Sequence, residues 1–307
     1  MIDFTKLLCD NQHVVQRLYT YCKANLQPHK PQTSYYTCFS NGSALFRLEF
    51  RNVFSAGKII GYRHVELCFS PHYIYNNFQH NGNDLHPSDC IETINKVFAE
   101  LRLRSSDLEM FRVVGIEFGI NIQLENKVEN VIAGFKYFKT KPFTTPHNSL
   151  PFFKTSNTTG YKVFKVYAKG LQYYNNPEYG IDRNTLRLEI KSKQAKKISK
   201  YAIYTAKNLL DKTIYAKLYQ ELLNELDYIF IVTSLTELSG YTADEQKLIA
   251  NMNDDSFIRH MSRVKFARMK EKYYKILGSQ NNLHLKIKGL VIDKLFTLQS
   301  VTFSTED

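Results

Sequence analysis

Alternation of apolar and polar side chains along five separate segments constrains the fold more than any other feature of this sequence. Successive side chains of a β-strand point to opposite faces of its sheet, so residues two apart share a face. The pattern predicts an α+β fold, in which an antiparallel five-stranded sheet carries helices on its apolar face. The apolar positions are Phe46, Leu48 and Phe50; Val65, Leu67 and Phe69; Ile116, Phe118, Ile120 and Ile122; Phe164, Val166 and Ala168; and Leu186, Leu188 and Ile190.

The opposite positions of the same segments carry the functional groups of a metal and phosphate site. For any one strand, a plain solvated face explains polar positions well. Glutamates, a histidine, a tyrosine, an arginine and lysines in one set favour a ligand-binding face instead. These positions are Arg47 and Glu49; His64, Glu66 and Cys68; Glu117, Gly119 and Asn121; Lys165, Tyr167 and Lys169; and Arg187, Glu189 and Lys191.

The rest of the chain predicts a sheet-rich first part and a helical second part. A domain of residues 1–193 and a basic, mostly helical region of residues 194–307 are expected. We expect a helix within the first 25 residues, a hairpin turn at Asn41-Gly42 and a helix that opens at Pro87. A short helix is expected at 128–138, a loop at 141–159, a short strand at 228–232 and a final strand in LHLKIKGLVI.

The net charge of +12 indicates a polyanionic partner, either nucleic acid or an anionic membrane surface. No stretch approaches the roughly 20 apolar residues of a spanning helix, and the start lacks the basic-then-apolar order of a signal peptide. Five cysteines without a C-x-x-C spacing indicate reduced thiols rather than disulfides or a zinc cluster. The sequence therefore predicts a cytoplasmic protein that binds nucleic acid and no membrane.

Tyrosine can cut a phosphodiester by forming a covalent phosphotyrosyl bond, whose energy is kept for rejoining. A divalent cation held by carboxylates would polarise the phosphate oxygens, and a nearby cation would offset charge in the transition state. Tyr167 and Lys169 supply the nucleophile and the cation. Glu117 and Glu189, with Glu66 and His64 as further candidates, supply ligands for Mg²⁺ or Mn²⁺.

Two segments about twenty residues apart, VYAKGLQY and LRLEIKSK, resemble the Y-x-K and R-x-E segment of rolling-circle replication initiators. The likeness is to filamentous-phage initiators and to trans-acting plasmid Rep proteins. VVGIEFGINI is similar to the family's acidic strand, and ISKYAIYTAKNLLD to the helix entry that follows. The resemblance covers roughly residues 110 to 215, and the motifs are short. It implies that Tyr167 is the nucleophile, that Glu117 and Glu189 are metal or acid–base carboxylates, and that Lys169 and Arg187 contact phosphate.

The chain departs from the family pattern at two places. Asn121 stands where a second acid is more usual, and no His-hydrophobic-His motif is present; the nearest is His64-Val65-Glu66. Tyr204, within the similar helix entry and three positions before Lys207, is a rival nucleophile. An ordinary half-buried strand tyrosine is the alternative interpretation of Tyr167.

Two lysine- and arginine-rich stretches predict phosphate contacts, because a solvated helix face normally mixes charges of both signs. Single-stranded and duplex origin DNA are the expected partners. No nucleotide-binding glycine motif is present, so a host helicase would unwind the duplex; the sequence leaves open whether the chain is a monomer or a homodimer. The predicted DNA-binding residues are Lys191, Lys193, Lys196, Lys197, Lys200, Arg259, Arg263, Lys265, Arg268, Lys270 and Lys272.

Together these features predict an initiator that nicks one DNA strand at an origin and stays attached through tyrosine. Two alternatives remain: an origin-binding or regulatory protein without cleavage chemistry, and a relaxase or transposase of a mobile element.

Overall fold

The computed structural model of the chain describes residues 1–28, 35–39, 46–147 and 152–300. Its larger sheet is antiparallel, with seven strands in the order β4-β5-β1-β6-β11-β10-β9, and β3 and β2 extend it beyond β4. A second sheet has the order β12-β7-β8. The strands are β1 (Ile2–Cys9), β2 (Gln27–Pro28), β3 (Tyr35–Phe39), β4 (Arg47–Ser55), β5 (Lys58–Phe69), β6 (Arg112–Gln123), β7 (Phe135–Phe138), β8 (Lys141–Pro142), β9 (Phe153–Thr159), β10 (Lys162–Ala168), β11 (Thr185–Ser192) and β12 (Ile229–Ile231).

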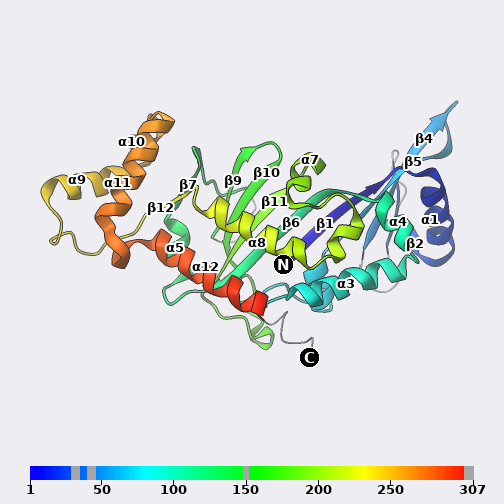
Figure 1. Cartoon of the computed structure of the whole chain (residues 1–307), viewed down its shortest axis with the longest axis horizontal. Helices are drawn as coiled ribbons and strands as arrows, with labels where there is room; N and C mark the ends of the chain where they lie inside the picture. The colour runs from blue at the N-terminus through cyan, green and yellow to red at the C-terminus, as the bar shows by residue number, and fades with distance from the viewer. Residues whose placement is uncertain (29–34, 40–45, 148–151, 301–307) are drawn as a thin grey trace.

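Longer helices lie in front of the larger sheet in Figure 1, and a group of helices forms one end of the molecule. The α-helices are α1 (Gln12–Asn25), α2 (Pro71–Tyr75), α3 (Pro87–Glu100), α4 (Ser105–Met110), α5 (Val128–Ala133), α6 (Lys169–Gln172), α7 (Ala195–Ile198), α8 (Thr213–Leu226), α9 (Ala243–Asn253), α10 (Asp255–Arg259), α11 (Arg263–Asn281) and α12 (Leu283–Ser300). The 3-10 helices are η1 (Pro177–Tyr179), η2 (Ser199–Tyr201) and η3 (Ala206–Leu210).

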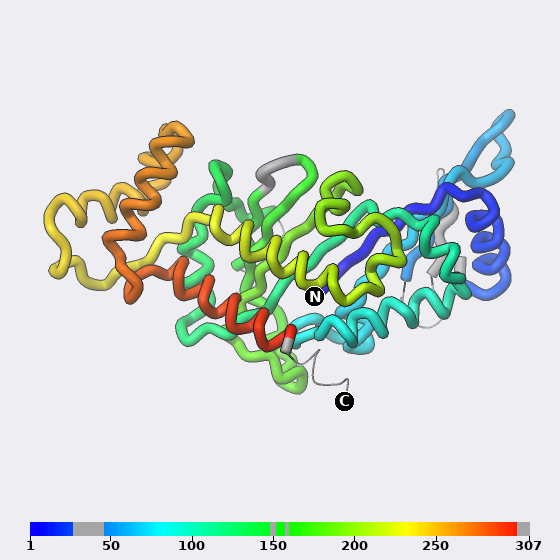
Figure 2. The backbone as a smooth tube through the Cα atoms, in the orientation of Figure 1, coloured from blue at the N-terminus to red at the C-terminus, as the bar shows by residue number. Residues whose placement is uncertain are grey.

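All five alternating segments form strands, β4, β5, β6, β10 and β11, and their apolar positions are buried. The predicted α+β class and helical C-terminal region are confirmed, but the sheet is larger than expected. Its apolar face packs against helices such as α1. There the ring of Tyr19 contacts that of Phe50 edge to face, with the ring centroids 5.7 Å apart. The larger core continues past residue 193, through Ile214 and Leu218 of α8 to Val291 of α12. Figure 2 shows α12 returning along the body of the molecule beside α8.

Polar side chains mark where several helices begin. Asn11 accepts a hydrogen bond from the Val14 amide at 3.2 Å and starts α1. Thr242 and Ser262 do the same for α9 and α11. An unpaired first-turn amide needs such an acceptor, so these residues fix the helix starts.

Four predictions of local structure are wrong. Residues 2–9 form the central strand β1 rather than part of a helix, and the segment LHLKIKGLVI lies in helix α12 rather than in a strand. The expected loop at 141–159 contains β8 and β9, and the expected helix at 128–138 ends early and becomes β7. The helix from Pro87 and the strand near residue 230 are confirmed, while the turn predicted at Asn41-Gly42 lies outside the described residues.

Helices α9, α10 and α11 enclose a second, smaller core with β12 and Tyr137 of β7. The rings of Phe230 and Phe266 contact there edge to face, with their centroids 5.5 Å apart. At the other end of the molecule, β4 and β5 continue beyond the sheet as a hairpin (Figure 1), which turns through Ala56 and Gly57 with φ of 46° and 75°.

None of the described helices combines the length and apolar character needed to cross a bilayer. Cys9, Cys22, Cys68 and Cys90 are buried free thiols.

Candidate functional site

The register of three neighbouring strands places the predicted site residues side by side. Paired positions in an antiparallel sheet project to the same face. Arg187 of β11 lies opposite Asn121 of β6 and Tyr167 of β10. Two residues further along β11, Glu189 lies opposite Gly119 and Lys165. Two residues beyond that, Lys191 lies opposite Glu117. The alternation in the sequence therefore gives one polar face across β6, β11 and β10.

Tyr167 is buried, with 6% of its surface exposed, and its ring packs on Phe153 with centroids 5.1 Å apart. Its hydroxyl donates a 2.6 Å hydrogen bond to Oε1 of Glu189. Burial, with the neighbouring Glu189 charge, raises the pKa of Tyr167 well above its ordinary value of 10. The phenol is therefore protonated at neutral pH, and Glu189 is the group placed to receive its proton.

Glu189 fits this position because residue 119 is glycine. A Cβ at Gly119 would lie 2.7 Å from Cγ of Glu189 and 2.3 Å from the Leu188 carbonyl oxygen, closer than atoms can approach. Arg187 Nε donates to Oε1 of Glu189 at 2.8 Å. Burial alone would raise the pKa of Glu189, but the Arg187 and Lys165 charges and the hydrogen bond from Tyr167 together hold this pKa below its ordinary value. Glu189 is therefore an ionised carboxylate.

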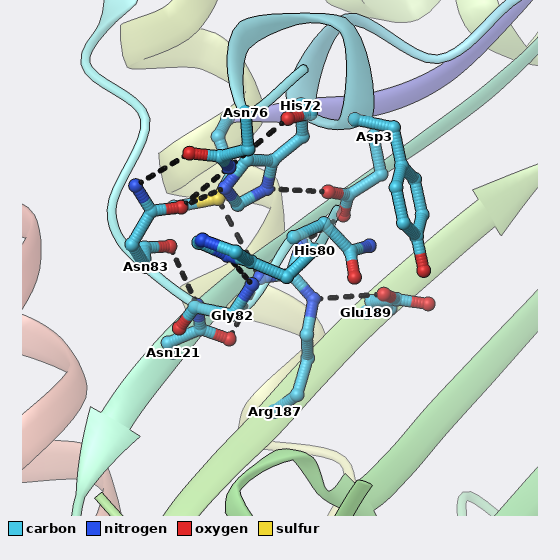
Figure 3. A network of polar contacts seen from close by, with 12 residues as sticks. Asp3, His72, Asn76, His80, Gly82, Asn83, Asn121, Arg187 and Glu189 are labelled. Carbon is cyan, nitrogen blue, oxygen red and sulfur yellow. Dashed lines mark hydrogen bonds and ion pairs between the residues drawn. The ribbon is translucent and has the colours of Figure 1, made fainter. Parts of the chain in front are cut away.

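Arg187 is fully buried beneath the pocket and is held by a polar network that includes β1 and α2 (Figure 3). Its guanidinium pairs with Asp3 and donates to Oδ1 of Asn121 at 2.7 Å. Asp3 also lies 3.1 Å from Nδ1 of His72, whose Nε2 is 2.9 Å from Oδ1 of Asn83. Arg187 therefore orients Glu189 from below and does not line the pocket, where the resemblance placed it as a phosphate contact.

Asp3 was missed by sequence reasoning because residues 2–9 were expected to be helical, and His72 because it lies on α2, outside the alternating segments. The strand that contains Asp3 is also irregular. The β1–β6 register shifts between Ile2 and Phe4, so that Ile2 pairs with Phe118 and Phe4 with Glu117. A bulge re-aims side chains that simple alternation would place on opposite faces. Asp3 and Phe4 consequently both line the pocket. The one signal in the sequence is the acid at position 3 within an otherwise apolar start.

Lys169 is buried on the other side of Tyr167, with 1% of its surface exposed. Its ammonium donates to Oδ1 of Asn81 and, at 3.0 Å, to Oε1 of Gln172. It lies 5.1 Å from the centre of the Tyr167 ring. Burial, with repulsion from Arg187, lowers the pKa of Lys169 to about 7. A proton on Lys169 can therefore be gained or lost near neutral pH.

Lys165 stands between the two glutamates. Its ammonium lies 2.5 Å from Oε2 of Glu117 and 3.3 Å from Oε2 of Glu189, and Lys191 pairs with the other oxygen of Glu117. A pocket of about 280 Å³ opens above these groups and is lined by Glu117, Lys165, Tyr167, Lys169 and Glu189, together with Asp3 and Phe4. We call this the tyrosine pocket.

Glu66 and His64 do not join it. They lie on β5, which is separated from β6 by β1, and Glu66 is paired with Lys6 at 2.8 Å. The prediction that Glu66 and His64 complete the site is therefore wrong, because β1, which lies between β5 and β6, was not expected to be a strand.

The described residues do not fit a preformed metal centre. Among them, no group of three or more His, Cys, Asp or Glu side chains is placed to hold a metal ion. Both glutamates of the tyrosine pocket are paired with basic side chains. Asn121, at the position of the family's second acid, donates to the carbonyl oxygens of Gly82 and Asn83 at 2.8 Å. Use of Mg²⁺ or Mn²⁺ stays a prediction from the sequence.

Tyr204, the rival nucleophile, is 60% exposed and lies outside the tyrosine pocket. It precedes η3, and its amide and that of Thr205 both donate to Oδ1 of Asn208 at 3.0 Å. These bonds explain the segment as the start of a short helix.

The predicted DNA-binding residues differ in exposure. Lys270 is turned inward: its ammonium donates to the Asp227 and Ile229 carbonyl oxygens at 2.9 Å, and burial lowers its pKa to about 8. It stabilises the smaller core and is not free to contact phosphate. Lys191 pairs with Glu117, and Lys197 lies 4.2 Å from the centre of the Tyr161 ring. The exposed members are Lys193, Lys196, Lys200, Arg259, Arg263, Lys265, Arg268 and Lys272.

No protein-family model matches this chain, and no curated protein matches it.

Proposed function

We propose that this protein nicks one strand of DNA by attack of Tyr167 on a phosphodiester, and so initiates rolling-circle replication. The observation that carries the proposal is the 2.6 Å hydrogen bond from the Tyr167 hydroxyl to an ionised Glu189, in a pocket that also holds Lys165 and Lys169. A nucleophile, a proton acceptor and two cations within one concavity are the parts that phosphoryl transfer to tyrosine needs.

The reaction that this arrangement supports is a direct displacement. As the Tyr167 oxygen bonds to phosphorus, its proton passes to Glu189, since a phenol with a raised pKa does not ionise beforehand. The bond from phosphorus to the leaving oxygen breaks, and Lys169 donates a proton to that oxygen. Because a polymerase extends a 3′-hydroxyl, the leaving oxygen in an initiator is O3′, and the 5′ phosphate stays on Tyr167. Reversal of the same transfers rejoins the strand.

The test is formation of a covalent adduct. Labelled single-stranded oligonucleotides, tiled across the DNA element that carries the gene, are incubated with the protein in EDTA, Mg²⁺ or Mn²⁺. A denaturation-resistant adduct, mapped by mass spectrometry to the peptide containing Tyr167, is the expected result. Binding that weakens with salt but gives no adduct on any oligonucleotide would overturn the proposal.

That outcome would favour a second candidate function, a DNA-binding protein without cleavage chemistry. The observation in its favour is that Arg187, Asp3 and Glu189 form a buried ion-pair network, which can serve structure alone. The exposed cations of α7 and α11 would still bind phosphate in such a protein.

The rate of adduct formation is expected to fall as pH rises through about 7. Lys169 has a pKa lowered to about 7, so its ammonium is lost above that pH, and the rate should fall about tenfold per pH unit if the charge is needed. Glu189 has a lowered pKa and stays ionised throughout this range. The measurement is the single-turnover rate between pH 6 and 9. In Lys169→Arg the charge persists but arginine does not release a proton, so the profile should be flat at a lower rate. A flat profile in the unmodified protein would contradict the role of Lys169.

Neutralising the exposed cations at the start of α11 is expected to weaken duplex binding and to leave single-strand nicking intact. Arg263, Lys265 and Arg268 are exposed on the helix that covers the smaller core, away from the tyrosine pocket. Changing all three to Gln should reduce the slope of log affinity against log salt by about one per charge removed. Fluorescence anisotropy over a salt series measures this slope. Lys96→Gln, which removes an exposed charge paired with Glu92, is the control and should change the slope little.

A further inference from the structure

A second hollow adjoins the tyrosine pocket. It has a volume of about 370 Å³ and shares Phe4, Ser70 and Tyr73 with the lining of the tyrosine pocket. The two therefore lie next to each other, but their chemistry differs. The tyrosine pocket is lined by charged groups, whereas the second hollow is lined mainly by aromatic rings. We call it the aromatic pocket.

The rings of the aromatic pocket fall into two groups. Phe46 and Phe69 are almost fully buried, with exposures of 1% and 3%, and they form its base. Phe78 is 36% exposed, and Phe4 and Tyr73 are partly exposed. Open aromatic surface next to a charged site stacks well with a nucleobase and is costly to leave in water. Arg47, also in the lining, adds a cation near the rings.

Phe78 is held in a backbone conformation that its side chain disfavours. Asn77 and Phe78 have φ values of 51° and 66°, in the left-handed region that favours glycine. Such conformations persist only where the surroundings fix them, and they gather at binding sites. Here the Phe78 amide donates to the Tyr73 carbonyl oxygen at 2.7 Å, and the Asn77 amide donates to that of Ile74 at 3.1 Å. These two bonds commonly close the C-terminus of a helix, and the turn after α2 presents Phe78 at a conformational cost.

This turn is tied to the network beneath the tyrosine pocket. Asn76 and Asn83 exchange two side-chain hydrogen bonds, of 2.7 and 3.0 Å, and Asn83 contacts His72. His72 in turn contacts Asp3, the partner of Arg187 (Figure 3). The position of Phe78 is therefore fixed relative to Glu189 and Tyr167 by one continuous set of polar contacts.

We propose that the aromatic pocket binds the unstacked base of the nucleotide next to the phosphate that Tyr167 attacks. The inference rests on the function proposed above. With the phosphate near Lys165 and Lys169, the attached base enters the adjoining hollow and packs against Phe78 and Phe4. Removing that base from the stack costs energy, and contact with the rings returns it. The bound base then holds the phosphate in line with the Tyr167 oxygen, so the pocket contributes positioning as well as affinity.

The test compares two short probes on a protein that cannot cleave them. Tyr167→Phe is titrated with a thymidine trinucleotide and with the same trinucleotide lacking its central base. The base-bearing probe is expected to bind about tenfold more tightly, as one stacked base allows. In the double variant Tyr167→Phe, Phe78→Gly the two probes should bind equally.

Glycine at position 78 separates binding from folding. It adopts the left-handed conformation without strain, so Phe78→Gly should raise or preserve the melting temperature while it removes the preference for the base. Phe296→Ala, which removes a 71% exposed ring of α12, is the matched control and should keep that preference.

The proposal that the aromatic pocket binds a base would be overturned by either of two results. One is equal binding of the two probes to Tyr167→Phe, and the other is an unchanged preference for the base-bearing probe in Phe78→Gly. These outcomes are distinct from failure of the proposed function. A covalent adduct without a base preference leaves nicking intact and refutes the pocket. A base preference without an adduct on any oligonucleotide refutes nicking and leaves a base-binding site.

Discussion

Replacing Tyr167 by phenylalanine is expected to abolish the covalent adduct with DNA, lowering its rate of formation by at least about a thousandfold. The substitution removes the one atom that bonds to phosphorus and leaves the ring on Phe153. Glu189 keeps its contacts with Arg187 and Lys165, so the free energy of unfolding should fall by only about 1 kcal/mol. The adduct is measured on denaturing gels with the oligonucleotide that the unmodified protein cleaves best.

The control is Tyr204→Phe, the rival nucleophile on the surface. Its hydroxyl lies outside the tyrosine pocket, so its removal should leave the adduct unchanged. Loss of the adduct in Tyr204→Phe, with retention in Tyr167→Phe, would assign the chemistry to a different tyrosine. Binding of the same oligonucleotide to both variants shows whether either change acts through affinity instead.

Arg187→Met is expected to lower the free energy of unfolding by about 3 to 5 kcal/mol, the usual consequence of breaking a buried ion pair on one side. The side chain is fully buried between Asp3 and Glu189. Methionine fills most of the volume but removes the cation between the two buried carboxylates, leaving Glu189 with Lys165 and Asp3 with His72. Urea unfolding at pH 7, followed by circular dichroism, measures the change.

Arg183→Met provides the comparison on the same stretch of chain. Arg183 pairs with Glu129 at 2.7 Å, but its side chain is 45% exposed. Exposed pairs contribute about 0 to 1 kcal/mol to stability. The free energy of unfolding of this variant should therefore be close to that of the unmodified protein. Similar losses in the two variants would mean that the Arg187 network does not stabilise the fold more than a surface pair.

Alternation sufficed to predict the polar face across β6, β11 and β10, because strand parity is a local property and the residues involved follow it without interruption. Tyr167, Lys169, Glu117 and Glu189 therefore reach one pocket as expected. The order of the strands is a long-range property, which periodicity does not contain. This is why Glu66 and His64, on β5 with the same parity, lie one strand too far away.

The two misassigned segments near the ends of the chain show that the spacing of apolar residues does not always distinguish a helix from a strand. Leu7, Leu8, Val14 and Leu18 suggest one continuous helix, yet the chain changes from strand to helix at Asn11. In LHLKIKGLVI the alternating leucines suggest a strand. The buried apolar residues of α12, however, are Ile287, Val291, Leu295 and Leu298, which recur every three to four positions as in a helix.

The place of β1 between β5 and β6 has a consequence for how the chain folds during synthesis. β1 is made first, but its partner β6 ends at residue 123, and β11, which closes the other side of β6, ends at residue 192. Contacts between distant parts of a chain form slowly, and an unpaired strand edge invites association with other chains. A nascent chain on the ribosome therefore exposes the open edge of β6 until β11 emerges, and at that stage this edge is open to pairing with other chains.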